Sequence, residues 1–390
     1  MPISSRRSFL QATGMAALAM RIVTEPMLAG AREKAYPNGA VIIDQNENPL
    51  GPCQTARDAI AAIAPQGGRY SLSLTDDLIV AFARTEGLRP EYVAVFPGSS
   101  PALHHSVLCF TSRERSYVTA NPGYEAGLYA ADHAGARTVN VPLTKDYAHD
   151  VRAMLDAAPD GGLFYICTPN NPTGTLTSHS DIEYLVDHKP KDSIVLVDEA
   201  YIHFADATSA IDMVKADKDV IVLRTFSKIY GMAGLRCGVA IARPDLLEKI
   251  QDYNGWSAMP VTAVAAGMAS LKDSQLVSER KRINSRVRAQ TFEWLRSHGY
   301  SFIPSQSNFF MLDAKRPGKE AIDAMAAQDV FIGRIWPIMP TWVRITVGTQ
   351  EEMERFQIAW KRVMDATAVG KLPQKRAVGR LQFDGTVIPT

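Results

Sequence analysis

Residues 163–174 read LFYICTPNNPTG, a short apolar run followed by a segment of Asn, Pro, Thr and Gly. Such a pattern predicts a buried strand that ends in a turn. The arrangement recurs downstream: Asp198-Glu199-Ala200-Tyr201 follows the apolar run 194–197, and Ser227-Lys228 comes soon after the run 220–223. Gly234-Leu235-Arg236 comes just before a further run, 238–242. Four polar loops are therefore expected at the ends of four strands.

Apolar runs of this kind alternate with helix-like segments between about residues 92 and 242. The runs are 93–96, 117–119, 138–141, 163–167, 194–197, 220–223 and 238–242. They are short, rich in β-branched residues and without a long polar face, which favours buried strands over helices. The alternation predicts an α/β fold with a mostly parallel sheet. Because ligands bind at the carboxyl ends of such strands, the polar loops should converge on one crevice.

The second half of the chain predicts a smaller domain. Residues 275–298 have the pattern of one long amphipathic helix, followed by strand-like segments at 308–312, 330–335 and 343–347 and helical ones at 319–327 and from Gln350. That mixture is typical of a small α+β domain. We predict a large domain over residues 70–265, and a linking helix with the small domain over 266–368. Residues 32–69 should pack on the small domain, and the tail 369–390 should be disordered.

Composition favours a small-molecule partner. The 390 residues are 46% hydrophobic, enough for a large core, and 42 basic against 41 acidic residues give a formal charge of +1. A balanced charge gives no reason to expect nucleic-acid binding. The four cysteines, Cys53, Cys109, Cys167 and Cys237, form no CxxC pair or zinc spacing, so no metal site is expected.

The N-terminal sequence has the pattern of an export signal. Arg6 and Arg7 lie in the run SRRSFLQ, an apolar stretch follows at 12–20, and Ala29-Gly30-Ala31 is a small-residue cleavage pattern. Together they predict a twin-arginine signal peptide over residues 1–31, cleaved near Ala31, which sends the folded protein to the periplasm through the twin-arginine machinery. A disordered or helical N-terminal extension is the alternative. Free thiols agree with folding in the reducing cytoplasm before export.

The polar loops carry the chemistry that pyridoxal phosphate requires. Lys228 stands beside a hydroxyl, Arg236 is near in sequence, and Asp198 follows a strand. A lysine supplies the amine for a Schiff base with this cofactor, and an aspartate keeps the pyridine nitrogen protonated so that the ring accepts electrons. The loops therefore predict a pyridoxal-phosphate site.

The ordered set of motifs resembles the fold-type-I pyridoxal-phosphate aminotransferases of class I/II, most closely the histidinol-phosphate aminotransferase branch. The resemblance runs from about Asp44 to Ala366. Its motifs are Asn46-Glu47-Asn48-Pro49, Tyr70, Gly98-Ser99-Ser100, Tyr124, PNNPTG at 169–174, DEAY at 198–201, Ser227-Lys228, Arg236 and VRITVG at 343–348. It implies a large domain with a mostly parallel central sheet and a small α+β domain.

The resemblance also implies residue roles around the cofactor ring. Lys228 would form the Schiff base and then move the proton between the substrate Cα and the cofactor C4′. Asp198 would pair with the pyridinium nitrogen, Asn171 and Tyr201 would hydrogen-bond the 3′ oxygen, and Tyr124 would stack on the ring.

Further roles concern the cofactor phosphate and the assembly. The phosphate would lie on the backbone amides of Ser99 and Ser100, with the Ser227 hydroxyl and the Arg236 guanidinium beside it. Tyr70 would reach the phosphate of the partner subunit's cofactor, so the resemblance implies a homodimer with shared active sites.

The substrate-binding positions implied by the resemblance are Arg344, Arg334 and Asn48. Arg344 would bind the substrate carboxylate or an equivalent anion, because a buried guanidinium needs an anionic partner. Arg334 would lie near the distal end of the substrate, and a surface salt bridge is the alternative. Asn48 belongs to the same group through its motif.

The chain departs from the histidinol-phosphate branch at three places. Leu50 replaces a tyrosine that helps to hold the substrate phosphate, Ser100-Pro101 replaces an acidic pair, and His203 follows the DEAY motif. Another amino acid or amine is therefore expected as donor, with a 2-oxo acid as acceptor. Candidate pocket aromatics, each of which could equally belong to the core, are Trp256, Trp336 and Trp342. Alternatives to an aminotransferase are a decarboxylase, lyase or racemase on this fold, and a non-catalytic cofactor-binding module.

Overall fold

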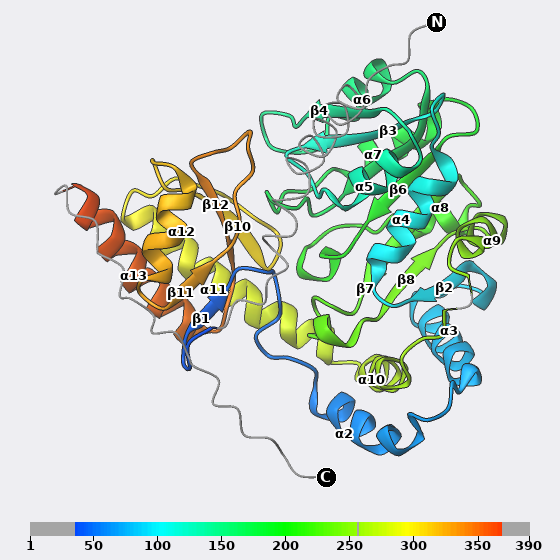
Figure 1. Ribbon diagram of the computed structural model, residues 1–390, viewed down its shortest axis with the longest axis horizontal. Helices are drawn as coiled ribbons and strands as arrows, with labels where there is room; N and C mark the ends of the chain where they lie inside the picture. The colour runs from blue at the N-terminus through cyan, green and yellow to red at the C-terminus, as the bar shows by residue number, and fades with distance from the viewer. Residues whose placement is uncertain (1–35, 256, 369–390) are drawn as a thin grey trace, which may run out of the picture. The chain divides into compact units, whose positions relative to one another are not determined.

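The computed structural model describes residues 36–255 and 257–368 (Figure 1). The predicted signal peptide, Trp256 and the predicted tail from residue 369 lie outside the described residues. Contacts divide the chain into two units between Ala40 and Val41, and all the elements below belong to the second unit.

A seven-stranded sheet with the order β2-β8-β7-β6-β5-β3-β4 forms the centre of the large domain. Its strands are β2 (Val93–Phe96), β3 (Ser116–Asn121), β4 (Thr138–Pro142), β5 (Gly161–Cys167), β6 (Ile194–Asp198), β7 (Val220–Thr225) and β8 (Gly238–Ile241). The β8 strand runs antiparallel to β2 and β7, and the other neighbours are parallel. The predicted strands and the mostly parallel sheet are confirmed.

Both faces of this sheet are buried, because alternate side chains of each strand enter different cores. Leu163 and Tyr165 of β5 belong to one hydrophobic cluster, and Phe164 and Ile166 to another. The first cluster is closed by α4 (Ser99–Phe110), α5 (Ala126–His133) and α9 (Pro244–Asp252). The second is closed by α2 (Gln54–Ile63), α3 (Leu72–Glu86), α6 (Val151–Ala157), α7 (His179–His188), α8 (Ile211–Lys215) and α10 (Val261–Lys272).

A separate core lies around two small sheets. One has the order β12-β10-β9 and is antiparallel, with strands β9 (Phe302–Ile303), β10 (Phe309–Asp313) and β12 (Trp342–Thr346). The other pairs β1 (Val41–Ile43) in parallel with β11 (Val330–Ile332). Helices α12 (Gly318–Ala326) and α13 (Gln350–Ala368) pack on this core. The predicted strands and helices of this region are confirmed, although the strand at 330–335 already ends at Ile332.

Helix α11 (Leu276–Ser297) confirms the long helix predicted at 275–298. It packs on α13 and on the short helix Ile202–Phe204, so it contacts both cores. Arg280 of α11 donates to the carbonyls of Ile229 (2.9 Å) and Gly51 (2.6 Å), which fastens the segment before α2 to the loop after β7. The predicted domain boundaries stay predictions, and α10 spans the one at residue 265.

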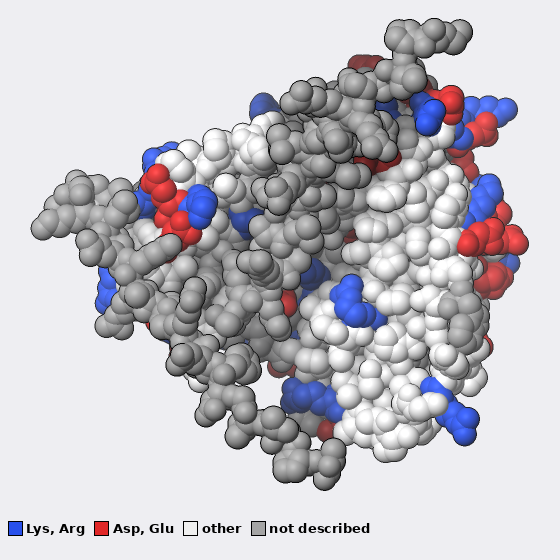
Figure 2. Space-filling view, viewed as in Figure 1, with Lys and Arg blue, Asp and Glu red and all other residues white. Residues whose placement is uncertain are grey.

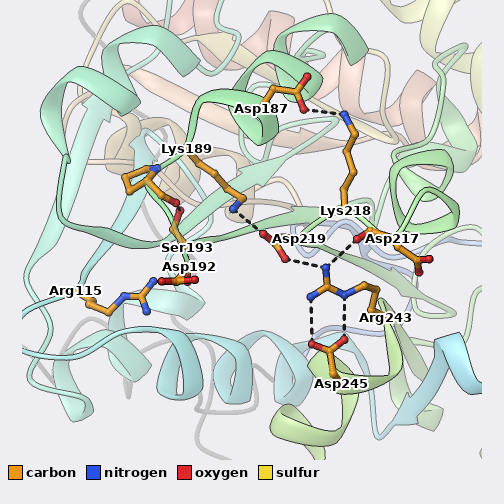
Figure 3. A network of polar contacts seen from close by, with 11 residues as sticks. Arg115, Asp187, Lys189, Asp192, Ser193, Asp217, Lys218, Asp219, Arg243 and Asp245 are labelled. Carbon is orange, nitrogen blue, oxygen red and sulfur yellow. Dashed lines mark hydrogen bonds and ion pairs between the residues drawn. The ribbon is translucent and has the colours of Figure 1, made fainter.

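Charged side chains occupy the edge of the large sheet where the parallel strands begin (Figure 3). Asp219, just before β7, pairs with Lys189 and with Arg243, each at 3.0 Å, and Arg243 also pairs with Asp245 at 3.0 Å. Figure 2 shows Lys and Arg beside Asp and Glu along the right edge of the drawn face. The polar loops singled out above lie at the opposite edge, where the parallel strands end.

Among the described residues, no helix is both long enough and apolar enough to cross a membrane.

Candidate active site

The polar loops meet at the carboxyl edge of the large sheet, as predicted. Asn171 follows β5, Asp198 ends β6, and Ser227 and Lys228 follow β7. Arg344 of β12 joins them, because its Nη1 donates to the Asn171 side-chain oxygen at 2.8 Å. The site is therefore built from both cores of the molecule.

Asp198 is a buried carboxylate, 4% exposed. In β6 it shares a face with Ile194 and Leu196, because alternate residues of a strand point the same way. Its oxygens accept from the Tyr165 hydroxyl (2.9 Å) and the Ala200 amide (3.1 Å), and no Lys or Arg of the described residues forms an ion pair with it. Burial raises the pKa of Asp198 to about 6. Such a carboxylate is suited to a cationic partner from a ligand.

Lys228 is half-buried, and its Nζ donates to the Gln45 carbonyl at 3.3 Å. The same nitrogen lies 5.6 Å from the centre of the Tyr201 ring. Burial lowers the pKa of Lys228 to about 8, the cations of Arg344 and Arg236 act in the same direction, and Glu47 and Asp198 oppose them. A lysine with this pKa has a substantial neutral fraction near pH 7.5, as a nucleophile or base requires.

An anion cradle lies at the start of α4. Gly98 has a φ of 92° before the helix, and a Cβ there would lie only 2.0 Å from the Arg236 Nη2, so the guanidinium passes directly over this glycine. Arg236 also donates to the Ser227 hydroxyl (3.4 Å) and the Ala233 carbonyl (2.6 Å). In the described structure no carboxylate pairs with Arg236. The amides at the start of a helix, a hydroxyl and an arginine together suit a phosphate.

The three predicted tyrosines lie in different surroundings. Tyr201 is buried, its hydroxyl accepts from the Asn46 side-chain amide at 3.3 Å, and its ring meets Phe309 edge-on with centres 4.8 Å apart. Tyr124 is half-buried next to Ser100, and burial raises its pKa. Tyr70, by contrast, is 64% exposed in the single chain.

Arg344 is 5% exposed and faces the site because its strand neighbours Val343 and Ile345 face the core on the other side. Its guanidinium donates to Asn171 and to the Asp44 carbonyl (3.0 Å), while its Nε has no partner in the structure. Burial lowers the pKa of Arg344 to about 10. Since a buried cation requires compensation, this guanidinium can bind a carboxylate.

The side chains of Arg334 and Asn48 already have polar partners within the protein. Arg334 Nη2 forms an ion pair with Glu125, and both side chains are half-exposed. The Asn48 side-chain amide donates to the Ile229 carbonyl (3.1 Å) and its oxygen accepts from the Leu50 amide (3.1 Å), so this side chain fastens its own loop to the loop after β7.

Several contacts at the site concern residues that sequence reasoning did not assign. Asn46 bonds to Tyr201 and to the Thr346 hydroxyl, which donates to its oxygen at 3.2 Å. Tyr165 holds Asp198. The Gly123 carbonyl accepts from the indole of Trp336, one of the predicted pocket aromatics, at 3.1 Å. Asn46 stands in the NENP motif at 46–49, so this motif was the signal for it, although Asn48 was the residue predicted to bind substrate. Tyr165 gave no signal apart from its apolar strand.

The other candidate residues have these surroundings. Trp336 is buried beside the site in a small hydrophobic cluster with Ile303 and Met311, and Trp342 packs against this cluster. Leu50 is 41% exposed. His203 contacts Arg224 at 3.0 Å, and burial followed by the charge of Arg224 lowers its pKa well below the ordinary value. Because Arg224 also pairs with the buried Glu199 at 2.7 Å, His203 belongs to a buried ion-pair cluster.

The donor set fits pyridoxal phosphate. Its phosphate would meet the cradle of Ser99, Ser100, Ser227 and Arg236, and its ring nitrogen would meet the carboxylate of Asp198, which has no ion-pair partner among the described residues. Its aldehyde would meet an amine whose pKa is lowered to about 8.

The chain belongs to the aminotransferase class I and II family, whose model matches residues 40–357. A histidinol-phosphate aminotransferase of Symbiobacterium thermophilum is 32% identical over 83% of this chain and 90% of its own length. An aromatic amino acid aminotransferase of Rhodococcus opacus is 36% identical over 83% of this chain and 90% of its own length. The solved histidinol-phosphate aminotransferase of Sinorhizobium meliloti, in complex with pyridoxal-5'-phosphate, has a TM-score of 0.76 and 27% identity, and the match covers 84% of this chain and 91% of that one.

Family, fold and site agree. The chain has the fold of the type-I pyridoxal-phosphate transferases, as predicted, and it is a pyridoxal-phosphate-dependent aminotransferase. Of the reactions that the sequence left open, transamination is the one that the family supports.

Proposed function

We propose that this aminotransferase acts on an amino acid whose α-carboxylate binds Arg344, with Lys228 as the catalytic amine. The observation that carries the proposal is the buried Arg344 guanidinium, which has an amide and a carbonyl as partners but no carboxylate in the described structure. When bound, pyridoxal phosphate supplies an electron sink that stabilises negative charge at the substrate Cα.

Each protein group then has a defined task. Lys228 would hold the cofactor and would move a proton between the substrate Cα and the cofactor's C4′, for which a pKa near 8 is suited. Asp198 would keep the ring nitrogen protonated. Asn171 and Tyr201 would orient the 3′ oxygen, Tyr124 would cover the ring, and the cradle at α4 would bind the phosphate.

The amino donor differs from histidinol phosphate in this proposal. Leu50 is exposed and carries no hydroxyl, so it cannot supply the hydrogen bond that a tyrosine would give to a substrate phosphate. The loss of such a bond to a charged group costs about 1.5–3 kcal/mol.

A homodimer completes the site in this proposal. The support is Tyr70, a large side chain that is 64% exposed in the single chain although the resemblance assigns it to a partner's cofactor phosphate. Leu72, two residues further on, is 49% exposed. Exposed apolar side chains that lie close together are typical of interaction surfaces.

We also infer that the folded enzyme is exported to the periplasm. The support is the Arg6-Arg7 run with its apolar stretch, together with four cysteines that are free thiols in the structure. Free thiols suit a protein that folds in the cytoplasm before export. Replacing both arginines with lysine should leave the protein in the cytoplasmic fraction with its signal uncleaved. Unchanged export of that variant would overturn the inference.

The central experiment uses Lys228→Ala. We expect the purified variant to lose the visible absorbance that the bound cofactor gives in the wild type and to lose all conversion of amino donors. A screen of amino acids and 2-oxo acids with the wild type, read as conversion of the cofactor between its two forms, identifies the substrates. Turnover retained by Lys228→Ala would refute the assignment of the catalytic amine.

A further inference from the structure

An ion pair borders the proposed carboxylate site. Glu125 stands directly before α5 in the loop after β3, and Arg334 follows β11, so the pair joins segments 209 residues apart in the chain. The side chain of Arg334 is 49% exposed and that of Glu125 is 30% exposed. Both charges therefore remain accessible to a ligand that enters the site.

The indole ring of Trp336 connects this pair with Arg344. The Arg334 Cζ lies 4.6 Å from the ring centre, and the Arg344 Cζ lies 5.5 Å from the same centre. The indole nitrogen donates to the Gly123 carbonyl, two residues before Glu125, which fixes the ring in place. Two guanidinium groups thus contact one aromatic ring, and of the two only Arg334 has a carboxylate partner among the described residues.

The two charges also act on Arg344 electrostatically. Burial is the main cause that lowers the pKa of Arg344, Arg334 lowers it further, and Glu125 raises it. The pair is therefore close enough to influence any anion bound at Arg344. Without Glu125, a substrate with a second anionic group would meet a second unpaired arginine.

We propose that Glu125 determines substrate range: it holds Arg334 in a neutral pair and so disfavours substrates whose distal end is anionic. This inference rests on the proposed function, which assigns the α-carboxylate to Arg344. A distal phosphate or second carboxylate has to displace the Glu125 carboxylate and then remains beside it, and like charges at that range repel. An uncharged distal group is not repelled by Glu125 and leaves the ion pair intact. The site thus favours amino acids and 2-oxo acids with uncharged side chains.

A purely structural role is the competing explanation, in which the pair only fastens the loop before α5 to the segment after β11. The two explanations predict different changes in the preference for substrates with an anionic distal group. If Glu125 selects substrates, Glu125→Gln favours anionic distal groups, whereas Arg334→Gln disfavours them further because the carboxylate is then unpaired. If the pair only fastens the loop, both variants affect all substrates in the same direction.

The first measurement is a single-turnover reaction of the amine form of the enzyme with an oxo acid. The ratio of second-order rate constants for 2-oxoglutarate over phenylpyruvate should rise at least about tenfold in Glu125→Gln and should fall in Arg334→Gln. Asp160→Asn is the matched control, because it breaks a half-exposed ion pair with Arg137 at the opposite edge of the sheet and should leave the ratio unchanged. An unchanged ratio in Glu125→Gln would overturn the proposal.

The second measurement does not depend on turnover. Calorimetric titration of the cofactor-bound protein with glutarate and with 3-phenylpropionate should show the same shift in relative affinity for Glu125→Gln. A wild type that converts no amino acid would refute the proposed function, whereas normal turnover with equal ratios in all variants would refute only the role of Glu125. Equal changes for both ligands in both variants would indicate the structural role.

Discussion

The buried carboxylate of Asp198 makes the stability of the cofactor-free protein depend on pH. Its pKa is about 6 in the folded chain and 3.8 in the reference state, so folding binds a proton more tightly. Below pH 3.8 the group is protonated in both states and has no destabilising effect. As the pH rises from 3.8 to about 6, the unfolded state releases its proton while the folded state retains it, and the stability of the folded state falls by about 3 kcal/mol in total, with no further change at higher pH.

Asp198→Asn should therefore remove a pH-dependent cost from the cofactor-free enzyme. The stability difference between variant and wild type should move in favour of the variant by about 2 kcal/mol between pH 4 and pH 7. Chemical denaturation of the cofactor-free proteins at both pH values measures it. A difference that does not change with pH would show that the carboxylate is already compensated. With cofactor bound, the order should reverse, because Asn cannot pair with a protonated ring nitrogen.

At the scale of elements, the strands of the large sheet were predictable because both faces are buried. A continuous apolar run such as residues 163–167 is then the natural sequence of a strand. The strand ends located Asp198, Lys228 and Asn171 at one edge. The three-residue β1 was too short to be recognised, and nothing near Asn46 indicates its bond to Thr346, 300 residues away. The pairing of Glu125 with Arg334 depends equally on the tertiary fold.

Removing side-chain volume from strand β5 should destabilise the protein strongly. Phe164 is fully buried, and a Cβ on Gly161 would lie 2.4 Å from its ring, so the packing around it is tight. Phe164→Ala should destabilise the protein by about 3–5 kcal/mol, because the cavity cannot collapse in a sheet covered on both faces. The shift of the urea midpoint measures this. Asp245→Asn in the ion-pair network of Figure 3, where the Asp245 side chain is 54% exposed and Arg243 keeps its pair with Asp219, should cost about 1 kcal/mol or less. Similar shifts for both variants would contradict this view of the core.

At the scale of the whole molecule, the proposed homodimer makes a complementation test possible. Lys228→Ala removes the amine of a subunit's own site, and Tyr70→Phe removes a hydroxyl that is proposed to serve the partner's site. Mixing the two variants after reversible dissociation should produce dimers with one intact site, about a quarter of all sites for random pairing. Cofactor retention and turnover in the mixture should exceed the mean of the separate variants. A mixture that equals this mean would place Tyr70 outside the partner's site.

The pairing of β1 with β11 links residues 41–43 to residues 330–332, and β12 follows only at residue 342. A chain still being synthesised therefore cannot position Arg344 or hold the Asn46 loop until nearly all of it has left the ribosome. Contacts between such distant segments also form slowly. Cofactor binding at the complete site thus requires that synthesis has passed β12, because a chain truncated before β12 lacks the guanidinium that bonds to Asn171. Only a chain that includes β12 can assemble the site. Under the proposed export, assembly must then be complete before the enzyme leaves the compartment where its cofactor is made.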